Sequence, residues 1–358
     1  MDLRGASAES VAALTDQLKA SVSGSVTAAA TAADSLFSVA QTLRDEPALR
    51  RFATDASVPV EARQGLVGEV FGGKLDPSAL DVVSDAVSRR WTHARDLADG
   101  IQRLSEVAAV LSAGDQGGQL SDELFAVGQA VAASPELRDA LSEPGRSDAD
   151  KSALLEQLLG GKLDQAALDI VSDAVSRRWT HARDLADGIQ RLSEVAAVLS
   201  AGEQGGQLSD ELFAVGQTVA ANPELRDALS EPGRNDDDKS ELLERLLGGK
   251  ALAATVSLAK QALSGTYGTF TAALSSYRRL AADVHGRSVA TVRVASALPD
   301  AQVERLTAAL AAQYGRPVHA NVVIDPAVIG GIRVEIGDDV IDGTIASRLD
   351  EAGRKLAG

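Results

Sequence analysis

The sequence predicts a mainly α fold, in which tandem six-helix bundles are followed by a small α+β C-terminal domain. Three observations lead to this fold class. One block of the chain recurs almost unchanged 88 positions later, the composition is rich in alanine and leucine but poor in aromatic residues, and the apolar pattern changes its period near residue 285.

The repeat is the clearest of these features. Residues 75–162 recur as residues 163–250, so that Trp91 reappears as Trp179 and Pro135 as Pro223. Fainter copies flank the two blocks, and Tyr267 occupies the position of Trp179 one repeat later. We therefore expect about three units with diverged outer ends, and a multiplied unit indicates several similar surfaces and not a single cleft.

The two blocks are nearly identical. Most of their differences exchange one residue that suits a protein surface for another. The differences are Pro77/Gln165, Ser78/Ala166, Val82/Ile170, Asp115/Glu203, Ala130/Thr218, Ser134/Asn222, Ser147/Asn235, Ala149/Asp237, Ala153/Glu241 and Gln157/Arg245. Either a recent tandem duplication or a deliberate construction accounts for this similarity.

The composition argues against several function classes. The formal net charge of −16 disfavours nucleic acid and anionic lipid as direct partners, because both need a basic surface. The chain has no cysteine, so disulfides and thiolate metal sites are excluded. It has no apolar run long enough for a membrane span and no signal-peptide pattern, so we expect no direct membrane insertion.

The first three helices of a unit can be placed on the block that follows residue 92. A long helix is predicted over residues 95–113, and the glycines at 114–118 end it. Its apolar face carries Leu97, Ile101, Leu104, Ala108 and Leu111. A second helix is predicted over 121–133, and Pro135 suits the first turn of a third helix over 135–141.

Two further helices complete the block. Ser147 and Asp150 resemble a capping box at the start of a fourth helix, which Gly160 and Gly161 end as a left-handed cap. The fifth helix is predicted to carry Leu168, Val171, Val175 and Trp179. Because none of these helices could bury its apolar stripe alone, we expect compact bundles at residues 1–92, 93–180 and 181–285.

After residue 285 the apolar residues alternate with polar ones, as in half-buried strands. Strands are predicted around 291–294, 318–324 and 332–336, with a helix around 300–314 between the first two. A tight turn at Gly337 and Asp338 should lead into a short strand at Val340 and Ile341, and a last helix is predicted over 344–356. Residues 286–358 thus form the predicted α+β domain.

Residues 325–345, which read DPAVIGGIRVEIGDDVIDGTI, strongly resemble the C-terminal signature of the delta subunit of F-type ATP synthases, called OSCP in mitochondria. The signature positions are Asp325, Pro326, Gly330, Gly331, Gly337, Asp338, Asp342 and Gly343. The helical units are similar to the N-terminal domain of that family, in which an Asn-Pro-Glu-Leu-Arg turn, here residues 222–226, precedes a helix start at 238–243. The alanine-rich style and residues 4–10 are similar to actinobacterial members with a long, doubled helical region; a third bundle exceeds even that form.

The resemblance implies a non-catalytic stator (peripheral stalk) subunit of a proton-translocating ATP synthase, without a cofactor. In the family, the helical domain binds amphipathic N-terminal helices of the alpha subunits, and the C-terminal domain binds the b-type peripheral stalk subunit. These two contacts resist the torque of the rotor. The implied location is the cytoplasmic face of the bacterial cell membrane, where the complex holds the subunit peripherally.

The resemblance also places the alpha-binding groove between the first and fifth helices of a bundle, where helix-in-groove recognition buries an apolar stripe. Transferred to this sequence, one groove in each bundle would be lined by two segments: residues 11–18 and 80–87, residues 97–111 and 168–175, and residues 185–199 and 256–263. The side chains assigned to it are Leu97, Ile101, Leu104, Leu185, Ile189, Leu192, Val256 and Leu263.

Several motifs have both a functional and a structural interpretation. The Gly-Gly-Lys sequences ending at residues 74, 162 and 250 evoke a phosphate loop, but the full spacing is absent and a helix C-cap is favoured. The acidic residues 235–238 are favoured as a helix N-terminus over a calcium loop.

The histidines and tryptophans of the repeat are similarly ambiguous. His93 and His181 lie close in sequence to Asp96 and Asp184, but without a clustered ligand set we favour hydrogen bonding over a metal or general-base site. Trp91 and Trp179 could be partner hot spots, yet closing the core at a helix end is favoured.

Two function classes remain open. One is the stator subunit, and the other is an engineered or duplicated helical-repeat scaffold that binds amphipathic partner helices without a role in ATP synthase. An enzyme is disfavoured because no set of acid, base and nucleophile recurs between the copies. Binding of both an alpha N-terminal peptide and a stalk fragment distinguishes the stator from the scaffold.

Overall fold

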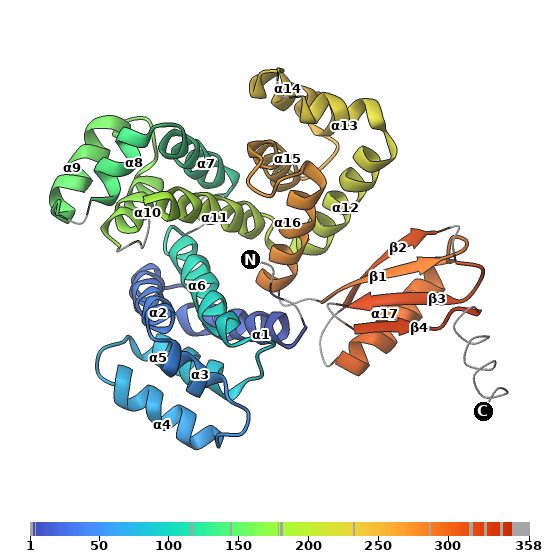
Figure 1. Cartoon of the computed structure of the whole chain (residues 1–358). Coiled ribbons are helices and arrows are strands. Elements are labelled where there is room, and N and C mark those ends of the chain that lie inside the picture. The colour runs from blue at the N-terminus through green and yellow to red at the C-terminus, as the bar shows by residue number, and fades with distance from the viewer. Residues whose placement is uncertain are drawn as a thin grey trace.

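The computed structural model describes residues 3, 5–114, 117–143, 145–177, 179, 182–231, 233–285, 288–314, 318–325, 328–336 and 339–345 (Figure 1). Within these ranges the chain forms seventeen α-helices and one four-stranded sheet. The predicted fold class, helical bundles followed by a small α+β domain, is confirmed.

The first helical unit is stabilised by side-chain caps at two helix starts. Its helices are α1 (Gly5–Val22), α2 (Val26–Asp45), α3 (Pro47–Thr54), α4 (Val60–Phe71), α5 (Pro77–Ser88) and α6 (Ala94–Leu111). Ser25 accepts a hydrogen bond from the Ala28 N–H, and Asp76 accepts one from the Ser78 N–H. These bonds pair backbone donors that the first helical turn leaves free.

The second unit follows the predicted order of helices. It contains α7 (Gly117–Ala133), α8 (Pro135–Ser142), α9 (Asp148–Leu159), α10 (Gln165–Ser176) and α11 (Ala182–Ser200). Ser147 accepts a hydrogen bond from the Asp150 N–H at 3.1 Å, as the capping-box pattern predicts. The prediction that the fifth helix carries Trp179 was wrong, because α10 ends at Ser176.

The third unit repeats this order with a modified end. A 3-10 turn η1 (Gly202–Gln204) leads into α12 (Gly205–Ala221), α13 (Pro223–Ser230), α14 (Asp236–Leu247), α15 (Ala253–Gln261), a second 3-10 turn η2 (Ala262–Ser264) and α16 (Phe270–Val284). Within α14, acidic residues occupy the first turn, where they interact favourably with the helix dipole.

The three helical units share one continuous apolar core. Helix α2 packs along α6, α7 along α11, and α12 along α16, while α11 also contacts α6, α15 and α16, and α16 contacts α1. The predicted limits at residues 92 and 180 stay predictions. The packing runs across both of them, because α6 and α11 begin after these limits and pack along helices that precede them.

The C-terminal domain has a separate core. Its strands β1 (Ser288–Val294), β2 (Val318–Ile324), β3 (Ile332–Ile336) and β4 (Asp339–Asp342) form a sheet in the order β2-β1-β3-β4. Strand β1 is parallel to β2 and antiparallel to β3, and β3 is antiparallel to β4. Helix α17 (Asp300–Tyr314) connects β1 to β2, and Leu306 and Leu310 pack on the apolar core of the sheet. The predicted last helix at 344–356 lies almost entirely outside the described residues.

Candidate partner-binding surfaces

The residues assigned to the alpha-binding groove lie in the interior of the helical part. Seven of them are buried, all but Val256 as members of the shared core, and the eighth, Leu263, is half-buried. The seven are Leu97, Ile101, Leu104, Leu185, Ile189, Leu192 and Val256. A partner helix could contact these side chains only if another element of the chain moved aside, so their role in binding stays a prediction.

The helix pairs that should border this groove do not all pack together. Helix α1 packs along α5, and α11 packs along α15, as a groove between first and fifth helices requires. The corresponding pair in the predicted bundle 93–180 is α6 and α10, but α6 packs along α1, α2 and α11. The first and fifth helices therefore pack together in the first and third predicted bundles but not in the second.

The two tryptophans of the repeat make the same backbone hydrogen bond and the same glycine contact. Each is half-buried and donates from Nε1 to a carbonyl five residues earlier, Trp91 to Ala86 at 2.8 Å and Trp179 to Ala174 at 2.7 Å. Each ring also lies against a glycine of the following helix, Gly100 or Gly188, where a Cβ would come within 2.8 Å or 2.5 Å of the ring. Both rings pack against the shared core, so the predicted role in core closure is confirmed, and Trp179 also meets the Phe37 ring edge to face, with ring centres 5.4 Å apart.

The histidine at the start of α6 has a structural role. His93 is the N-cap residue of α6, and its N–H donates to Asp96, whose carboxylate also accepts from Ser7. Among the described residues no group of three or more His, Asp or Glu side chains is placed to bind a metal ion. His181 lies outside the described residues.

The Gly-Gly-Lys sequences end helices, as predicted. Gly73, Gly161 and Gly249 have φ values of +72°, +76° and +68°, in the left-handed region that glycine favours. The following lysine N–H donates to the carbonyl three residues earlier, for example Lys162 to Leu159 at 2.9 Å. This is a left-handed helix cap and not a phosphate loop.

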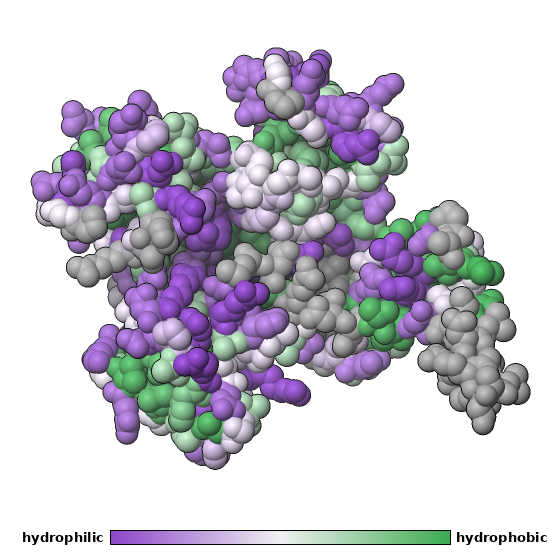
Figure 2. Space-filling view, in the orientation of Figure 1, coloured by the Kyte–Doolittle hydropathy of each residue, from purple (hydrophilic) through white to green (hydrophobic). Residues whose placement is uncertain are grey.

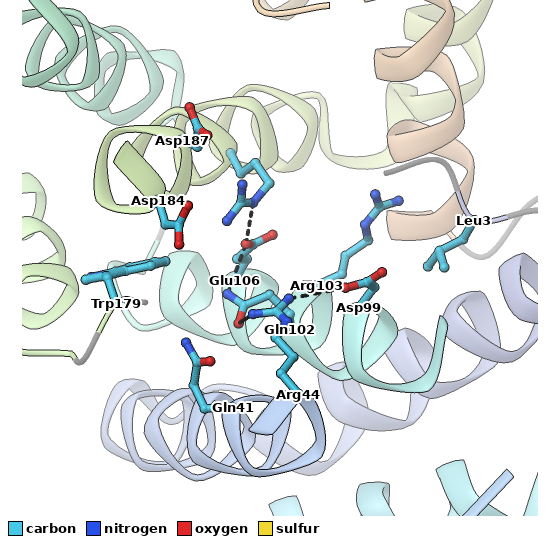
Figure 3. Close-up of a pocket in the computed structure, with 11 residues that line it drawn as sticks. Leu3, Gln41, Arg44, Asp99, Gln102, Arg103, Glu106, Trp179, Asp184 and Asp187 are labelled. Carbon is cyan, nitrogen blue, oxygen red and sulfur yellow. Dashed lines mark hydrogen bonds and ion pairs between the residues drawn. The ribbon is translucent and has the colours of Figure 1, made fainter. Parts of the chain in front are cut away.

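A polar cleft of about 280 Å³ lies between the first and second units (Figure 3). Its arginines come from three helices, and each is already paired: Arg44 with Asp99 at 3.3 Å, Arg191 with Glu106 at 2.8 Å, and Arg103 with Asp283 at 2.5 Å. Because these charges neutralise each other, the cleft joins parts of the chain and offers little net charge to a ligand.

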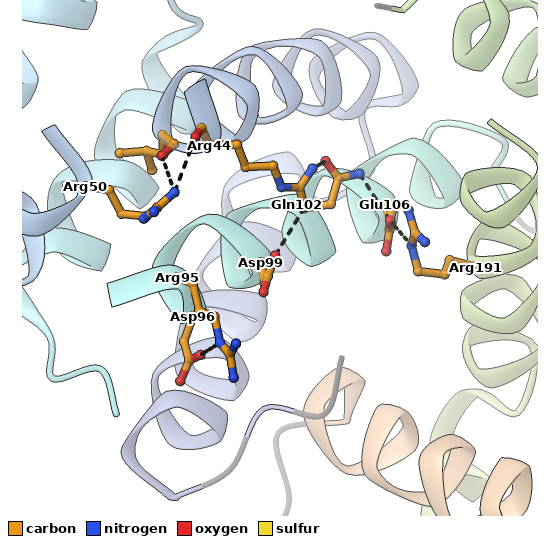
Figure 4. A network of polar contacts seen from close by, with 9 residues as sticks. Arg44, Arg50, Arg95, Asp96, Asp99, Gln102, Glu106 and Arg191 are labelled. Atoms are coloured by element: carbon orange, nitrogen blue, oxygen red, sulfur yellow. Dashed lines mark hydrogen bonds and ion pairs between the residues drawn. The ribbon is translucent and has the colours of Figure 1, made fainter. Parts of the chain in front are cut away.

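The network continues across the cleft from helix to helix (Figure 4). Gln102 accepts a hydrogen bond from Arg44 at 3.4 Å and donates one to Glu106 at 3.1 Å. Burial alone would raise the pKa of Glu106, but the Arg191 guanidinium and the bonds from Arg191 and Gln102 hold this pKa below its usual value. Glu106 is thus a buried carboxylate that joins α6 to α11.

In the C-terminal domain, the glycines of the signature bring two loops close together. Gly331 has φ +82°, and a Cβ on it would lie 2.3 Å from the Gly343 carbonyl oxygen. The Gly343 N–H donates to Ile332 at 2.9 Å, and the Ile345 N–H donates to Gly330 at 3.0 Å. Only residues without side chains allow this approach.

The acidic signature residues fix the same region. Asp325 donates through its N–H to Val294 at 2.8 Å, and its carboxylate lies 3.7 Å from Arg293. Asp342 accepts from the Thr344 hydroxyl and N–H, and these bonds lower the pKa of its carboxyl. Pro326, Gly337 and Asp338 lie outside the described residues.

Several large apolar residues of this region are exposed, and they were not among the predicted site residues. In order of exposure they are Ile329 at 80%, Ile324 at 57%, Val340 at 52%, Ile345 at 48% and Ile341 at 38%. Figure 2 shows apolar side chains at several places on the C-terminal domain. An apolar residue in the loop before Gly330 and two adjacent apolar residues at 340–341, which break the strand alternation, were the signal for them in the sequence.

Comparison with known proteins supports one family. A profile of the family described as ATP synthase delta (OSCP) subunit matches residues 195–356. A protein named ATP synthase subunit delta from Nocardioides sp. is 52% identical over 240 residues, which cover 67% of this chain and 87% of that protein. Proteins of the same name from Kineococcus radiotolerans and Streptomyces coelicolor are 44% and 42% identical over 248 and 243 residues, covering 68% and 67% of this chain and 90% and 89% of the relatives.

The chain belongs to the ATP synthase delta (OSCP) subunit family. The predicted resemblance, including that to actinobacterial long forms, is therefore confirmed, and the chain is a non-catalytic subunit. In the part of the chain that the structure describes, no helix is both long and apolar enough to cross a membrane.

The chain is longer than these delta subunits. Since 240 residues make up 87% of the Nocardioides protein, that protein has about 276 residues, against 358 here. The difference is close to one 88-residue repeat. This chain therefore carries about one helical unit more than the delta subunit that it resembles.

Proposed function

We propose that the chain is a stator subunit of a proton-translocating ATP synthase, which links the alpha subunits of the catalytic head to a b-type peripheral stalk and so resists rotor torque. The helical units bind amphipathic N-terminal helices of alpha subunits, and the C-terminal domain binds the stalk. The complex holds the subunit peripherally at the cytoplasmic face of the membrane.

The observation that carries this proposal is the set of large apolar side chains that the C-terminal domain exposes, Ile324, Ile329 and Ile345 near one end of the sheet and Val340 and Ile341 on its edge strand β4. Register places Ile324 beside Val294 and Ile332 at one end of the sheet, and the loop that carries Ile329 follows β2 at that end. An apolar side chain as exposed as Ile329 gains most from burial against a partner helix.

The first prediction tests this surface. Ile329→Asp and Ile345→Asp should each weaken binding of a soluble b-stalk fragment by at least ~10-fold, because a carboxylate would be desolvated at the contact. Titration calorimetry measures the affinity. Val26→Asp is the matched control, because Val26 is 55% exposed but lies on α2; it should leave stalk binding unchanged.

All three variants should keep the helical circular dichroism of the parent chain and should bind an alpha N-terminal peptide with unchanged affinity. Unchanged stalk affinity in folded Ile329→Asp and Ile345→Asp would show that the stalk binds elsewhere. Failure of the parent chain to bind both the alpha peptide and the stalk fragment would favour a scaffold without a role in ATP synthase.

A further inference from the structure

A buried carboxyl group joins the second and third helical units. Glu194 lies on α11 and is 2% exposed. Tyr267, in the loop between η2 and α16, donates a hydrogen bond from Oη to Glu194 Oε2 at 2.7 Å. On α11 itself, Gln190 donates from Nε2 to Glu194 Oε1 at 3.3 Å. The carboxyl group is therefore bonded to both sides of the contact.

Gln190 extends this contact along the same loop. The Thr266 hydroxyl donates to Gln190 Oε1 at 2.9 Å, and Gln190 Nε2 donates to Ser264 Oγ at 3.3 Å. The loop is exposed at Gly265 and Gly268, whose φ values are +75° and +78°. Side-chain hydrogen bonds to Gln190 and Glu194 thus attach an exposed, glycine-flanked loop to α11.

The same glutamate in the preceding unit has a different partner. Glu106 occupies the repeat position of Glu194, is 4% exposed and accepts a charged hydrogen bond from Arg191 at 2.8 Å. Arg279 occupies the repeat position of Arg191, yet no arginine or lysine among the described residues forms an ion pair with Glu194. One copy of this junction is held by an ion pair and the other by a phenol hydrogen bond.

Other charged and titratable groups lie around this contact. Arg191 on the same helix and Glu106 on α6 influence Glu194, Arg103 on α6 influences Tyr267, and Tyr277 on α16 is influenced by Glu194. The two tyrosine rings meet edge to face at 5.5 Å, and the Tyr277 hydroxyl is buried without a hydrogen-bond partner.

The balance of these groups favours the protonated carboxyl. Burial is the largest cause, and Glu106 adds repulsion, while the bonds from Tyr267 and Gln190 and the charge of Arg191 act in the opposite direction. Together they raise the pKa of Glu194 to about 7.

We propose that the contact between α11 and residues 264–267 is a pH-sensitive clasp, held closed while the Glu194 carboxyl carries a proton and loosened when that carboxyl ionises. Ionisation leaves a buried carboxylate without a paired cation, and moving the loop away from α11 lets water reach it. This property goes beyond the proposed stator role and does not depend on which partners bind.

The test measures opening of the clasp in the full-length chain. Amide hydrogen exchange of residues 262–285, corrected for the intrinsic rate, gives the equilibrium constant for local opening. With a carboxyl pKa of about 7 when closed and 4.5 when open, this constant should rise roughly 30-fold between about pH 5.5 and about pH 8. Opening increases with pH because the pKa of Glu194 is raised in the closed state. The stabilisation of the closed state is therefore present at low pH and is lost as the pH rises through 7.

The matched variants are Glu194→Gln and Glu106→Gln, which make the same change at the two repeat positions. Glu194→Gln mimics the protonated carboxyl, so the pH dependence should disappear while the loop stays protected. Glu106→Gln removes a repulsion that raises the pKa of Glu194 and releases Arg191, so the rise in opening should persist but be smaller than in the parent chain. A flat pH profile in the parent, or an unchanged rise in Glu194→Gln, would overturn the proposal.

A second measurement does not rely on the folding of either variant. In the parent chain labelled with ¹³C at glutamate carboxyl groups, nuclear magnetic resonance should show one buried carboxyl that titrates with a midpoint near 7. If every glutamate carboxyl titrated below about pH 5.5, the clasp would not exist.

Discussion

At the scale of single residues, equivalent positions in the repeat make the same contact only where the neighbouring helices have the same arrangement. Arg63 Nη1 donates to the Val87 carbonyl at the end of α5, and Lys151 Nζ donates to the Val175 carbonyl at the end of α10. Both cations satisfy carbonyls of a last helical turn. Lys239, the third copy, pairs instead with Asp236 at 3.1 Å, because α15 ends earlier and η2 follows it.

Two left-handed glycines with different surroundings should differ in the stability that is lost when each is replaced by alanine. Gly331→Ala should destabilise the C-terminal domain by more than the ~1 kcal/mol that a left-handed alanine costs, because the new methyl group also collides with the Gly343 carbonyl. Gly73→Ala is the control, since Gly73 has φ +72° and open space around the added methyl. Urea unfolding gives the two free-energy changes, and equal losses would contradict the close approach of the two loops.

The sequence was sufficient to identify the signature but not the exposed surface beside it. A glycine such as Gly331 is recognisable because its backbone conformation excludes other residues. The loop position of Ile329 marked it as a candidate, but the exposed fractions of Ile329 and Ile345 depend on how residues 328–331 and 343–345 pack against each other, and no local pattern encodes that contact. For the same reason the groove residues, assigned from the family resemblance to apolar positions of the first and fifth helices, could not be told from core residues.

At the scale of elements, α6 shows which part of the fold the local pattern determines. Its apolar stripe and the glycines at 114–118 predicted a helix over 95–113, close to the observed Ala94–Leu111, but its neighbours were not predictable. Besides its apolar stripe, α6 buries Gln102, Ser105 and Glu106, because it packs along α2 on one side and meets α11 on another. An apolar stripe predicts one buried face of a helix. It does not predict the burial of polar residues, which depends on hydrogen-bond and ion-pair partners from other helices.

The Glu106–Arg191 pair between α6 and α11 should make stability depend on acid pH. Because the pKa of Glu106 is lowered in the folded chain, its contribution is present above about pH 4.5 and is lost as the pH falls further. Glu106→Gln should therefore lower the free energy of unfolding by about 1–3 kcal/mol at neutral pH, and the difference should shrink towards pH 3. Urea titrations across this range measure it; a constant difference at all pH values would show that Glu106 is not ionised in the fold.

At the scale of the whole molecule, two separate cores indicate that the C-terminal domain can be removed without unfolding the helices. The shared helical core ends with Val284, and the sheet has its own core around Ala290, Val292 and Val334. A chain lacking residues 286–358 should keep its helical circular dichroism and alpha-peptide binding but lose binding of the stalk fragment. Stalk binding by this truncated chain would show that the domain roles are assigned wrongly.

The extra unit permits the most direct test of what the repeat contributes. Deleting residues 163–250 joins Lys162 to Ala251 in the same context as Lys250 and Ala251, so no new junction sequence is created. Helix α16 would then occupy the place of α11, and Arg279, at the repeat position of Arg191, could pair with Glu106. The contacts of α16 with the first unit, Arg103 with Asp283 and Lys19 with the Val284 carbonyl, would be lost.

We therefore expect the shortened chain to fold, with a lower midpoint of thermal unfolding than the parent, and to bind the stalk fragment with unchanged affinity. If each unit binds an alpha N-terminal helix, calorimetry should show one alpha-peptide site fewer than in the parent. Deleting residues 75–162 is the matched control, because the two blocks are nearly identical, and both deletions should give the same number of sites. An unchanged number of sites in both would show that the additional unit binds no alpha helix and instead extends the distance between the catalytic head and the stalk.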